Sequence, residues 1–346
     1  NVADGDGGAI NSNGTVNIAA SSFVGNQARG FANNGNNPAT GYGGAISMDG
    51  SDTLKLALTN FAGNVADKGG GAVYWSANNA EFSDVVFSGN IVNGTGSNST
   101  APRGGGAIYA AGNSSLTLIR TALSGNLAPT SNGGALYSEI GATTVISTTS
   151  FNGNIAASPS STGMGGAIYN GGGKIDVAQA LFLNNAVAQG NGGALANDRH
   201  GQVSLANTTF TANAAPQGDG GAIFNTNTQQ GGPISSVAAR NVTFSANAAT
   251  NASQHGGAIF NDTGHSVSLG NTIVDGSVGD NCTGTITSLG HNLDSANTCA
   301  LNGPGDLPNG SAKLDTPGFN GGPLAALLTQ KLLAGSVAID AGDPAI

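Results

Sequence analysis

The chain has 346 residues, of which 58 are glycine and only 8 % are charged, and its formal net charge at pH 7 is −9. Only two glutamates occur, Glu81 and Glu139. The sequence therefore lacks the Glu, Lys and Arg that normally fill the exposed faces of helices, and we expect strands and turns instead. Five Arg and five Lys scattered over an acidic chain argue against binding to nucleic acid phosphates.

Export from the cell is favoured by the low charge and by the abundance of Gly, Asn, Ser and Thr. No apolar run approaches the roughly 20 residues that span a bilayer, so no membrane span is expected. The amino terminus has no basic segment followed by an apolar one. We therefore expect a secreted protein of the extracellular cell surface, either already processed or made without such a signal.

Two short motifs recur in step from the start of the chain to about residue 276. The first is Gly-Gly-Ala followed by an aliphatic residue, with the last two residues at Ala9-Ile10, Ala45-Ile46, Ala72-Val73, Ala107-Ile108, Ala135-Leu136, Ala167-Ile168, Ala194-Leu195, Ala222-Ile223 and Ala258-Ile259. The second is Phe-x-x-Asn, at Phe23/Asn26, Phe61/Asn64, Phe87/Asn90, Leu123/Asn126, Phe151/Asn154, Phe182/Asn185, Phe210/Asn213 and Phe244/Asn247. Repeats of this length indicate a solenoid, in which each unit buries its apolar face against its neighbours.

The first repeat illustrates how one coil is built. Val16 and Ile18 are spaced by two residues, which predicts a short strand with one buried face. Phe23 follows Ile18 after an odd interval, so a bend must separate it from that strand. Ser21 and Phe23 then form a second inward pair, and the Gly-Gly-Ala-aliphatic segment supplies a third strand. Three short strands in each of about nine stacked coils predict an all-β fold, a right-handed, single-stranded parallel β-helix.

Equivalent residues of stacked coils should form ladders. We expect the Phe positions to form an aromatic ladder inside the coil and the Asn positions an amide ladder at a corner. Asn suits a corner because it tolerates the left-handed conformation and its side chain bonds the backbone or the next amide. The Gly-Gly pair permits a sharp turn and a close approach of neighbouring coils.

A second aromatic row lies two residues after the motif alanine, and its face is left open by the sequence. Either the row lines a sugar-binding groove, or it packs laterally or at a corner, which is the interpretation we favour. Its members are Tyr74, Tyr109, Tyr137, Tyr169, Phe224 and Phe260.

Insertions follow the ladder Asn at Gln27–Tyr42 and Ile91–Arg103, and the alanine strand at Thr226–Ser235. In a solenoid such insertions emerge from corners and decorate one side of the rod. Variable loops on a fixed scaffold are where binding is usually found.

A pectin-lyase-like architecture raises the alternative of a polysaccharide lyase or hydrolase, which needs paired carboxylates or acidic calcium ligands with a base. Asp49 and Asp52 share a turn, whereas Asp84 and Asp176 fall at different positions of their coils. Asp198, Arg199 and His200 share one loop, which we interpret as a solvated turn. Asp4-Gly5-Asp6-Gly7 offers oxygens to calcium only weakly, and an N-terminal turn is preferred. We therefore predict no catalytic, cofactor-binding or metal-ligating residues.

The two cysteines, Cys282 and Cys299, lie outside the repeats. If paired, they close a short loop and stabilise the fold by about 3 kcal/mol in an oxidising compartment. The alternative is two free thiols. We expect the bridge.

The two repeated motifs resemble those of polymorphic outer membrane proteins and related bacterial β-helix surface proteins. Residues 277–346 resemble a choice-of-anchor Q domain, through Ser288-Leu289-Gly290-His291-Asn292-Leu293, Asn320-Gly321-Gly322-Pro323 and Ala338-Ile339-Asp340-Ala341-Gly342-Asp343. The resemblance implies a surface or secreted destination. It divides the chain into a β-helix domain, residues 1–276, and a C-terminal capping or assembly region, residues 277–346.

The sequence thus predicts a non-enzymatic, structural or adhesive protein, with polysaccharide binding or degradation as the alternative. The first coil has no visible cap, and an open β-helix end recruits further strands. One expectation is that Gly7, Gly8, Ala9 and Ile10 meet the C-terminal region of another copy, through a strand that contains Val337, Ile339 and Ala341. The equally weighted alternative is that residues upstream of Asn1 cap this end. Such a head-to-tail contact propagates as a filament, so the expected partner is the chain itself. Glycans or cell surfaces are further expected partners.

Overall fold

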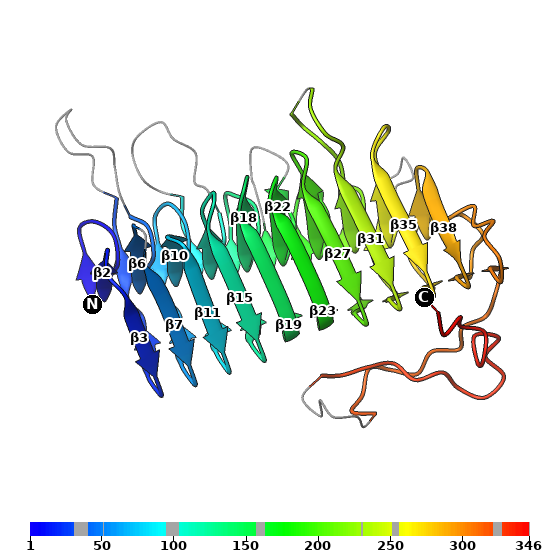
Figure 1. Cartoon of the computed structure of the whole chain (residues 1–346), viewed down its shortest axis with the longest axis horizontal. Coiled ribbons are helices and arrows are strands. Elements are labelled where there is room, and N and C mark those ends of the chain that lie inside the picture. The colour runs from blue at the N-terminus through cyan, green and yellow to red at the C-terminus, as the bar shows by residue number, and fades with distance from the viewer. Residues whose placement is uncertain are drawn as a thin grey trace.

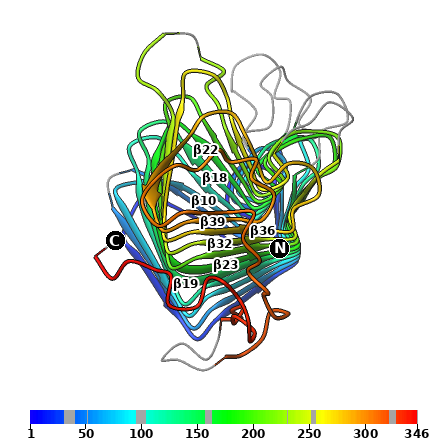
Figure 2. The ribbon, with the colours of Figure 1, turned by 90° about the vertical axis from the view of Figure 1, so that its right-hand side faces the viewer.

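The computed structural model describes residues 1–30, 41–50, 52–94, 104–156, 163–229, 231–250, 256–320 and 327–345. Within these residues there is no helix, and the strands wind into a parallel β-helix, seen from the side in Figure 1 and end-on in Figure 2. The predicted fold class is confirmed. Each turn of the chain adds strands to three long sheets, which we name A, B and C.

Sheets A and B take one strand from each coil. The strands of sheet A are β1 (Val2–Ala3), β5 (Gln27–Ala28), β9 (Val65–Ala66), β13 (Ile91–Val92), β17 (Leu127–Ala128), β20 (Ile155–Ala156), β24 (Ala186–Val187), β29 (Ala214–Ala215) and β33 (Ala248–Ala249). Those of sheet B are β2 (Ile10–Ser12), β6 (Ile46–Asp49), β10 (Val73–Ser76), β14 (Ile108–Ala110), β18 (Leu136–Glu139), β22 (Ile168–Gly171), β26 (Leu195–Asp198), β30 (Ile223–Asn225), β34 (Ile259–Asn261) and β37 (Cys282–Thr283).

Sheet C takes two stretches from each coil. Its strands are β3 (Val16–Ala19), β4 (Ser22–Val24), β7 (Thr53–Ala57), β8 (Asn60–Ala62), β11 (Asn79–Ser83), β12 (Val86–Ser88), β15 (Ser115–Ile119), β16 (Ala122–Ser124), β19 (Thr143–Asn152), β23 (Lys174–Leu183), β27 (Gln202–Ala206), β28 (Thr209–Thr211), β31 (Ser236–Arg240), β32 (Thr243–Ser245), β35 (Ser266–Gly270), β36 (Ile273–Asp275), β38 (Ile286–Gly290), β39 (Leu293–Asp294) and β40 (Leu307–Pro308). A small separate pair is formed by β21 (Gly163–Met164) and β25 (Gly190–Asn191).

The three predicted strands of a coil are present, and the two before the ladder Asn belong to one bent sheet, C. The bend lies three residues before the ladder Phe and has a positive φ, for example at Ala20 (φ 47°), Arg120 (φ 47°) and Asn207 (φ 49°). Each coil also contains a fourth strand, which belongs to sheet A and was not predicted from the sequence. The strands of sheet A are only two residues long, too short for an alternating pattern to be recognised.

The aromatic ladder lies inside the rod, as predicted. Phe151 pairs in register with Leu123 on one side and with Phe182 on the other. The rings of Phe151 and Phe182 stack with centroids 4.7 Å apart, and those of Phe182 and Phe210 with centroids 4.4 Å apart. All four side chains are fully buried. Stacked aromatic rings with offset geometry contribute attraction beyond the area they bury.

The amide ladder is also present and buried. Asn90 Nδ2 donates to Asn126 Oδ1 over 2.9 Å and to the Phe61 carbonyl over 3.1 Å, and the backbone N–H of Asn90 donates to the same Asn126 Oδ1. The left-handed residue at this corner precedes the Asn, as at Gly63 (φ 59°) and Ala212 (φ 55°). The expectation that Asn itself adopts this conformation is therefore wrong. Its role is to hydrogen-bond successive coils.

The Gly-Gly pair forms the predicted sharp turn and allows the predicted close approach of neighbouring coils. The first glycine turns the chain with a positive φ, as at Gly70 (φ 63°). The second lies against the next coil, because a Cβ atom at Gly71 would come within 2.0 Å of the Gly106 carbonyl oxygen. Any side chain at this position would separate the coils.

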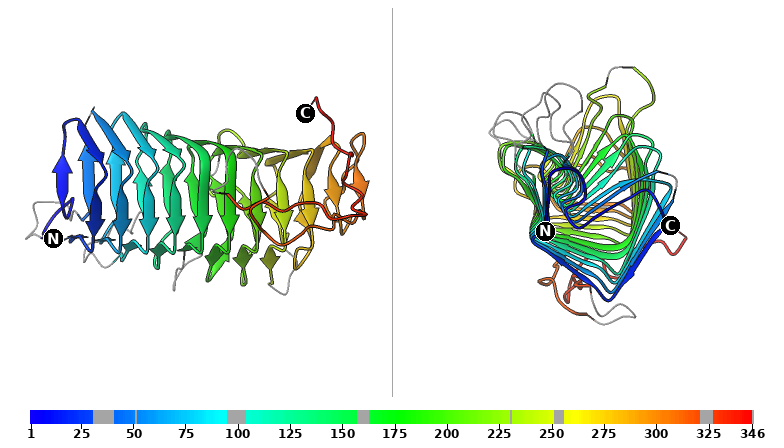
Figure 3. Two further views of the ribbon diagram at one scale, coloured as in Figure 1. Left: turned by 90° about the horizontal axis from the view of Figure 1, so that it is seen from below. Right: turned by 90° about the vertical axis from the view of Figure 1, so that its left-hand side faces the viewer.

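The stack continues past residue 276, since β37 pairs with β34, β38 with β35 and β39 with β36. The rest of the chain then folds back. Leu314 pairs antiparallel with Leu332, and Gly318 with Thr329. Figures 1 and 3 show this segment lying beside the rod, and Ser245 Oγ of sheet C donates to Gln330 Oε1 over 2.5 Å. Residues 277–346 as a separate domain stay a prediction.

Candidate functional site

No group of three or more His, Cys, Asp or Glu side chains within the described ranges is placed to hold a metal ion. In the same ranges, no helix has the length and apolar character needed to cross a membrane. The candidate sites are therefore the outer surfaces of the rod, which we take in turn.

The second aromatic row packs laterally on the outer face of sheet B. Pleating explains this face, because Ile168 points into the core and the next residue, Tyr169, must point outward. Tyr42 joins the row, and ring centroids lie 5.5 Å apart for Tyr74 and Tyr109 and 4.9 Å apart for Tyr109 and Tyr137. Tyr109, Tyr137 and Tyr169 are buried, so they offer no platform to a sugar. The lateral-packing interpretation is confirmed.

Asp198 anchors the row and a neighbouring insertion. Its carboxylate accepts a hydrogen bond from the Tyr169 hydroxyl over 2.7 Å, and bonds from the backbone N–H and hydroxyl of Thr228 over 2.7 and 2.8 Å. Burial, followed by the charge of Asp198, raises the pKa of Tyr169 well above its usual range, so the hydroxyl stays protonated and donates. Asp198 is only 1 % exposed, so the interpretation as a solvated turn is wrong for Asp198, whereas Arg199 and His200 do form a turn in which Arg199 is exposed.

His200 holds the same insertion, residues 226–235. Its Nδ1 lies 3.0 Å from Asn227 Nδ2 and makes a short contact with the Pro233 carbonyl oxygen, while its backbone N–H donates to Ser235 Oγ. Thr226 Oγ1 ties the start of the insertion to Asp262. Both ends of the insertion are therefore held on the rod, and Ile234, near its C-terminal end, is 53 % exposed.

Three further acidic residues, Asp6, Asp84 and Asp176, have local structural partners. Asp6 Oδ1 accepts hydrogen bonds from the backbone N–H groups of Gly41 and Tyr42, which fits the predicted N-terminal turn. Asp84 pairs with Arg120 over 2.7 Å. In the same way, Asp176 pairs with Lys174 over 2.9 Å.

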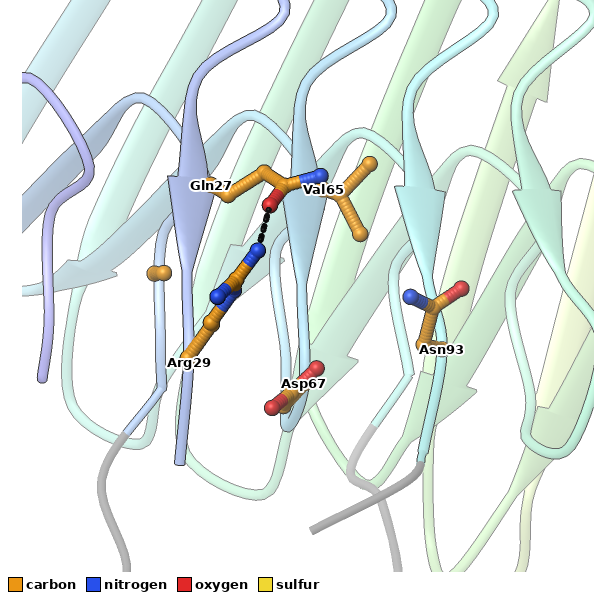
Figure 4. A pocket seen from close by; sticks show the side chains of 6 residues that line it. Gln27, Arg29, Val65, Asp67 and Asn93 are labelled. Atoms are coloured by element: carbon orange, nitrogen blue, oxygen red, sulfur yellow. Dashed lines mark hydrogen bonds between the residues drawn. The ribbon is translucent and has the colours of Figure 1, made fainter. Parts of the chain in front are cut away.

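A polar groove crosses the outer face of sheet A at the first coils (Figure 4). It encloses about 320 Å³ and is lined by Gln27, Ala28, Arg29, Val65, Asp67 and Asn93. Arg29 Nη2 donates to Gln27 Oε1 over 2.9 Å, and Asp67 Oδ2 accepts from the Gly30 N–H over 2.9 Å. This groove was not predicted from the sequence.

A signal for the groove was present in the repeats. Arg29, Asp67 and Asn93 each lie three residues after a ladder Asn, in three successive coils. Long insertions begin at this point in two of the three repeats, which hides the alignment. The parts of those insertions at residues 31–40 and 95–103 lie outside the described residues.

The residues expected to mediate assembly lie at both ends of the chain. Gly7 and Gly8 are buried, Ala9 is exposed, and Ile10 is half-buried at the edge of the core. Val337 and Ile339 are each 47 % exposed, and Ala341 is partly buried. The expected strand is not formed, because residues 337–340 form turns held by hydrogen bonds such as Ala341 N–H to Ala338 C=O.

The predicted disulfide between Cys282 and Cys299 is present, with the Cα atoms 4.7 Å apart. Both cysteines are buried with Leu301 at the C-terminal end of the core. The bridge thus ties the loop that closes this end to β37, the last strand of sheet B.

One family model matches the chain, that of the Chlamydia polymorphic membrane protein (Chlamydia_PMP) repeat, over residues 148–171 and 207–226. Each segment starts at a left-handed bend of sheet C, at Thr148 or Asn207, and continues through the ladder Asn and Gly-Gly-Ala-Ile. No curated protein and no solved structure matches the chain. The matched segments coincide with structural repeats of the rod, and the chain therefore carries repeats of the polymorphic membrane protein type.

Proposed function

We propose that the chain is an extracellular, structural and adhesive protein of a bacterial surface. The observation that carries this proposal is the coincidence of the family repeat with the coil of a stiff rod. The matched family is described as a membrane protein, and the rod holds both ends of the insertion at residues 226–235. A rod with anchored loops suits contact with another surface.

Adhesion is tested by coating fluorescent beads with the purified chain and measuring their retention on cells under flow. Retention above that of albumin-coated beads is expected. A matched pair of variants locates the contact, since Ile234→Asp alters an exposed apolar side chain of the insertion whereas Ser204→Asp alters an exposed site on sheet C. Beads that are retained no better than albumin would contradict the proposal.

An enzymatic function on polysaccharides is the second candidate, and no specific observation favours it. Four of the acidic candidates have structural partners, since Asp6 bonds a turn, Asp84 and Asp176 form ion pairs, and Asp198 anchors the insertion. Release of reducing sugar or unsaturated product from a polymer, lost on changing one carboxylate, would replace the non-enzymatic proposal.

We propose further that residues 277–346 form a cap of the choice-of-anchor Q type. Two of the three motifs behind this resemblance touch each other, because His291 Nδ1 lies 2.7 Å from the Ala341 carbonyl oxygen. Next to them, Asn271 exchanges two hydrogen bonds with the backbone of Asp343. The third motif begins at Asn320, and its remaining residues lie outside the described ones.

Head-to-tail assembly remains our proposal for the interaction between copies. At the first coil, Ile10, Val16, Ile18 and Phe23 are only partly buried, whereas their equivalents in inner coils are fully buried. The exposed Val337 and Ile339 offer a complementary apolar surface at the other end of the chain. Electron microscopy of the purified chain tests this proposal. Fibres that vanish on deletion of residues 336–346 are expected, and single rods unchanged by the deletion would refute it.

A further inference from the structure

The groove on sheet A has a rigid backbone. Arg29, Asp67 and Asn93 stand in one column because their N–H groups donate to Ala3, Ala28 and Ala66 of the preceding coils, over 2.9, 3.1 and 2.8 Å. The residues two positions earlier, Gln27 and Val65, pair in register between β5 and β9. Gln27 and Val65 lie on these strands, and Arg29, Asp67 and Asn93 each follow directly after the end of β5, β9 or β13. The backbone hydrogen bonds between coils therefore hold the lining residues in a regular stack.

The lining has a distinctive chemistry, because four of its side chains end in planar polar groups. These are the carboxamides of Gln27 and Asn93, the guanidinium of Arg29 and the carboxylate of Asp67 (Figure 4). Together they present both donors and acceptors. Val65, which stands beside Gln27, adds one apolar side chain. A ligand with hydroxyl groups at its edge and C–H groups on its face uses every part of this lining.

Charge narrows the class of ligand. Arg29 and Asp67 carry opposite charges on neighbouring coils, so the charge of the lining sums to zero. An anionic ligand meets Asp67 and a chain of net charge −9, and a cationic ligand meets Arg29. An uncharged ligand meets neither repulsion and accepts hydrogen bonds from Arg29 while donating to Asp67, which are the stronger, charge-assisted bonds.

Size gives a further limit. A volume of about 320 Å³ lies at the lower end of the range for small-molecule sites, which runs from about 300 to 1,000 Å³. Toward the C-terminus the column of Gln27 and Val65 continues with the apolar residues Ile91, Leu127 and Ile155. The polar lining is thus confined to the first three coils, and it suits one short stretch of a chain-like ligand.

We propose that this groove binds a sugar residue of a neutral glycan. In this site Asp67 and Asn93 accept hydrogen bonds from ring hydroxyls, and Arg29 donates to a hydroxyl or ring oxygen. The C–H face of the sugar lies on Val65. The proposal rests on the adhesive function proposed above and gives it a ligand class.

The test is binding of the purified full chain to an array of neutral oligosaccharides built from glucose, galactose, mannose or N-acetylglucosamine, with polygalacturonate and sulfated glycans as charged probes. We expect at least one neutral glycan to be retained and the charged probes not to be. Arg29→Ala and Asn93→Ala should each weaken retention at least tenfold. Asn79→Ala, an exposed amide on β11 of sheet C, is the matched control and should leave retention unchanged.

Two results would overturn the proposal: no neutral glycan retained, or equal retention by the groove variants and the control. Unchanged circular dichroism and thermal midpoints exclude misfolding as the cause of a loss, and Asp67→Asn keeps the acceptor for the Gly30 N–H while removing the charge. The bead assay separates the two proposals. Adhesive beads without glycan binding refute the groove alone, and glycan binding without adhesion refutes the adhesive function alone.

Discussion

Single residues fix the geometry of every coil through two left-handed positions, one at the bend of sheet C and one before the ladder Asn. Glycine fills many of the second positions, as at Gly63, but Arg120 and Leu58 occupy the first with φ of 47° and 49°. Residues with a Cβ atom pay roughly 1–2 kcal/mol for this conformation. Packing of the core offsets this conformational cost, because the bend lets the apolar side chains on both stretches of sheet C point into the rod.

The aromatic ladder concentrates stability at single side chains. Phe151 is fully buried between Leu123 and Phe182. We expect Phe151→Ala to lower the free energy of unfolding by about 3 to 5 kcal/mol, because the substitution removes apolar contacts and leaves a cavity. Denaturant unfolding followed by circular dichroism measures the loss. Ser204→Ala, at an exposed position of the same sheet, should change it by no more than about 0.5 kcal/mol; equal losses would show that the register of the ladder is wrong.

The ion pair between Asp84 and Arg120 predicts a pH dependence. Arg120 donates two hydrogen bonds to the carboxylate, over 2.8 and 2.7 Å, and these bonds, with the positive charge, lower the pKa of Asp84. A carboxylate with a lower pKa in the folded chain contributes stability above its unfolded pKa, about 3.9. That contribution is lost as the pH falls through the lower, folded pKa. It is small here because the pair is exposed.

Carbon-13 NMR of the Asp84 carboxyl group measures this shift directly. The titration midpoint should lie below that of a model peptide and should rise in Arg120→Gln. Arg240→Gln, on the same sheet but without contact to Asp84, is the control and should leave the midpoint unchanged. A midpoint that Arg120→Gln does not move would contradict the prediction.

At the scale of the strands, the features that recur at a fixed spacing in every repeat could be predicted from the sequence. The spacing of Val16, Ile18 and Phe23 was enough to place two strands and the bend between them. The face of the Tyr row follows from pleating alone, since Ile168 and Tyr169 are neighbours on one strand. Its burial does not follow, because burial depends on tertiary cover that the repeat spacing does not encode.

A second amide ladder, inside sheet B, was not predicted from the repeats. Asn170 Nδ2 donates to Asn197 Oδ1 over 2.8 Å, and the ladder continues to Asn225 and Asn261. In the earlier coils the same inward position holds Met48 and Trp75. The amide is therefore absent from five of the nine coils, in which this position holds Ser12, Met48, Trp75, Ala110 and Ser138. Buried amides are stable there because each finds partners along the stack, which a single repeat does not reveal.

The disulfide stabilises the C-terminal end of the rod. Cys282 and Cys299 are 17 residues apart and close the loop that covers the core at Leu301. The double variant Cys282→Ala/Cys299→Ala should lose about 3 kcal/mol, the value expected for closing a loop of this length. The loss should be local, so amide hydrogen exchange should accelerate in β37 and β38 and stay unchanged in β19. Acceleration spread over the whole rod would show that the bridge does not act at the end.

On the scale of the whole molecule, the rod is one-dimensional, because each coil contacts mainly the coil before and the coil after. The two ends differ. The C-terminal end of the core is closed by the disulfide loop, and Cys299 and Ala312 are fully buried there. At the other end, among the described residues, β2 pairs with β6 and β3 with β7 on one side, and the Phe23 ring stacks on that of Phe61. Edge strands with unpaired backbone groups favour pairing with another chain.

This asymmetry yields a test of assembly that does not depend on seeing fibres. If copies join through the first coil, the backbone N–H groups and apolar side chains of β2 and β3 become covered as protein concentration rises. Hydrogen exchange in these strands should then slow over a hundredfold range of concentration, while exchange in the central strand β19 stays constant. Ile18→Asp places a charge on the exposed end of the core and should abolish the concentration dependence, whereas Asn17→Asp, which points outward from the same strand, should preserve it. Exchange in β2 and β3 that is equally fast at every concentration would show that the first coil does not bind another copy.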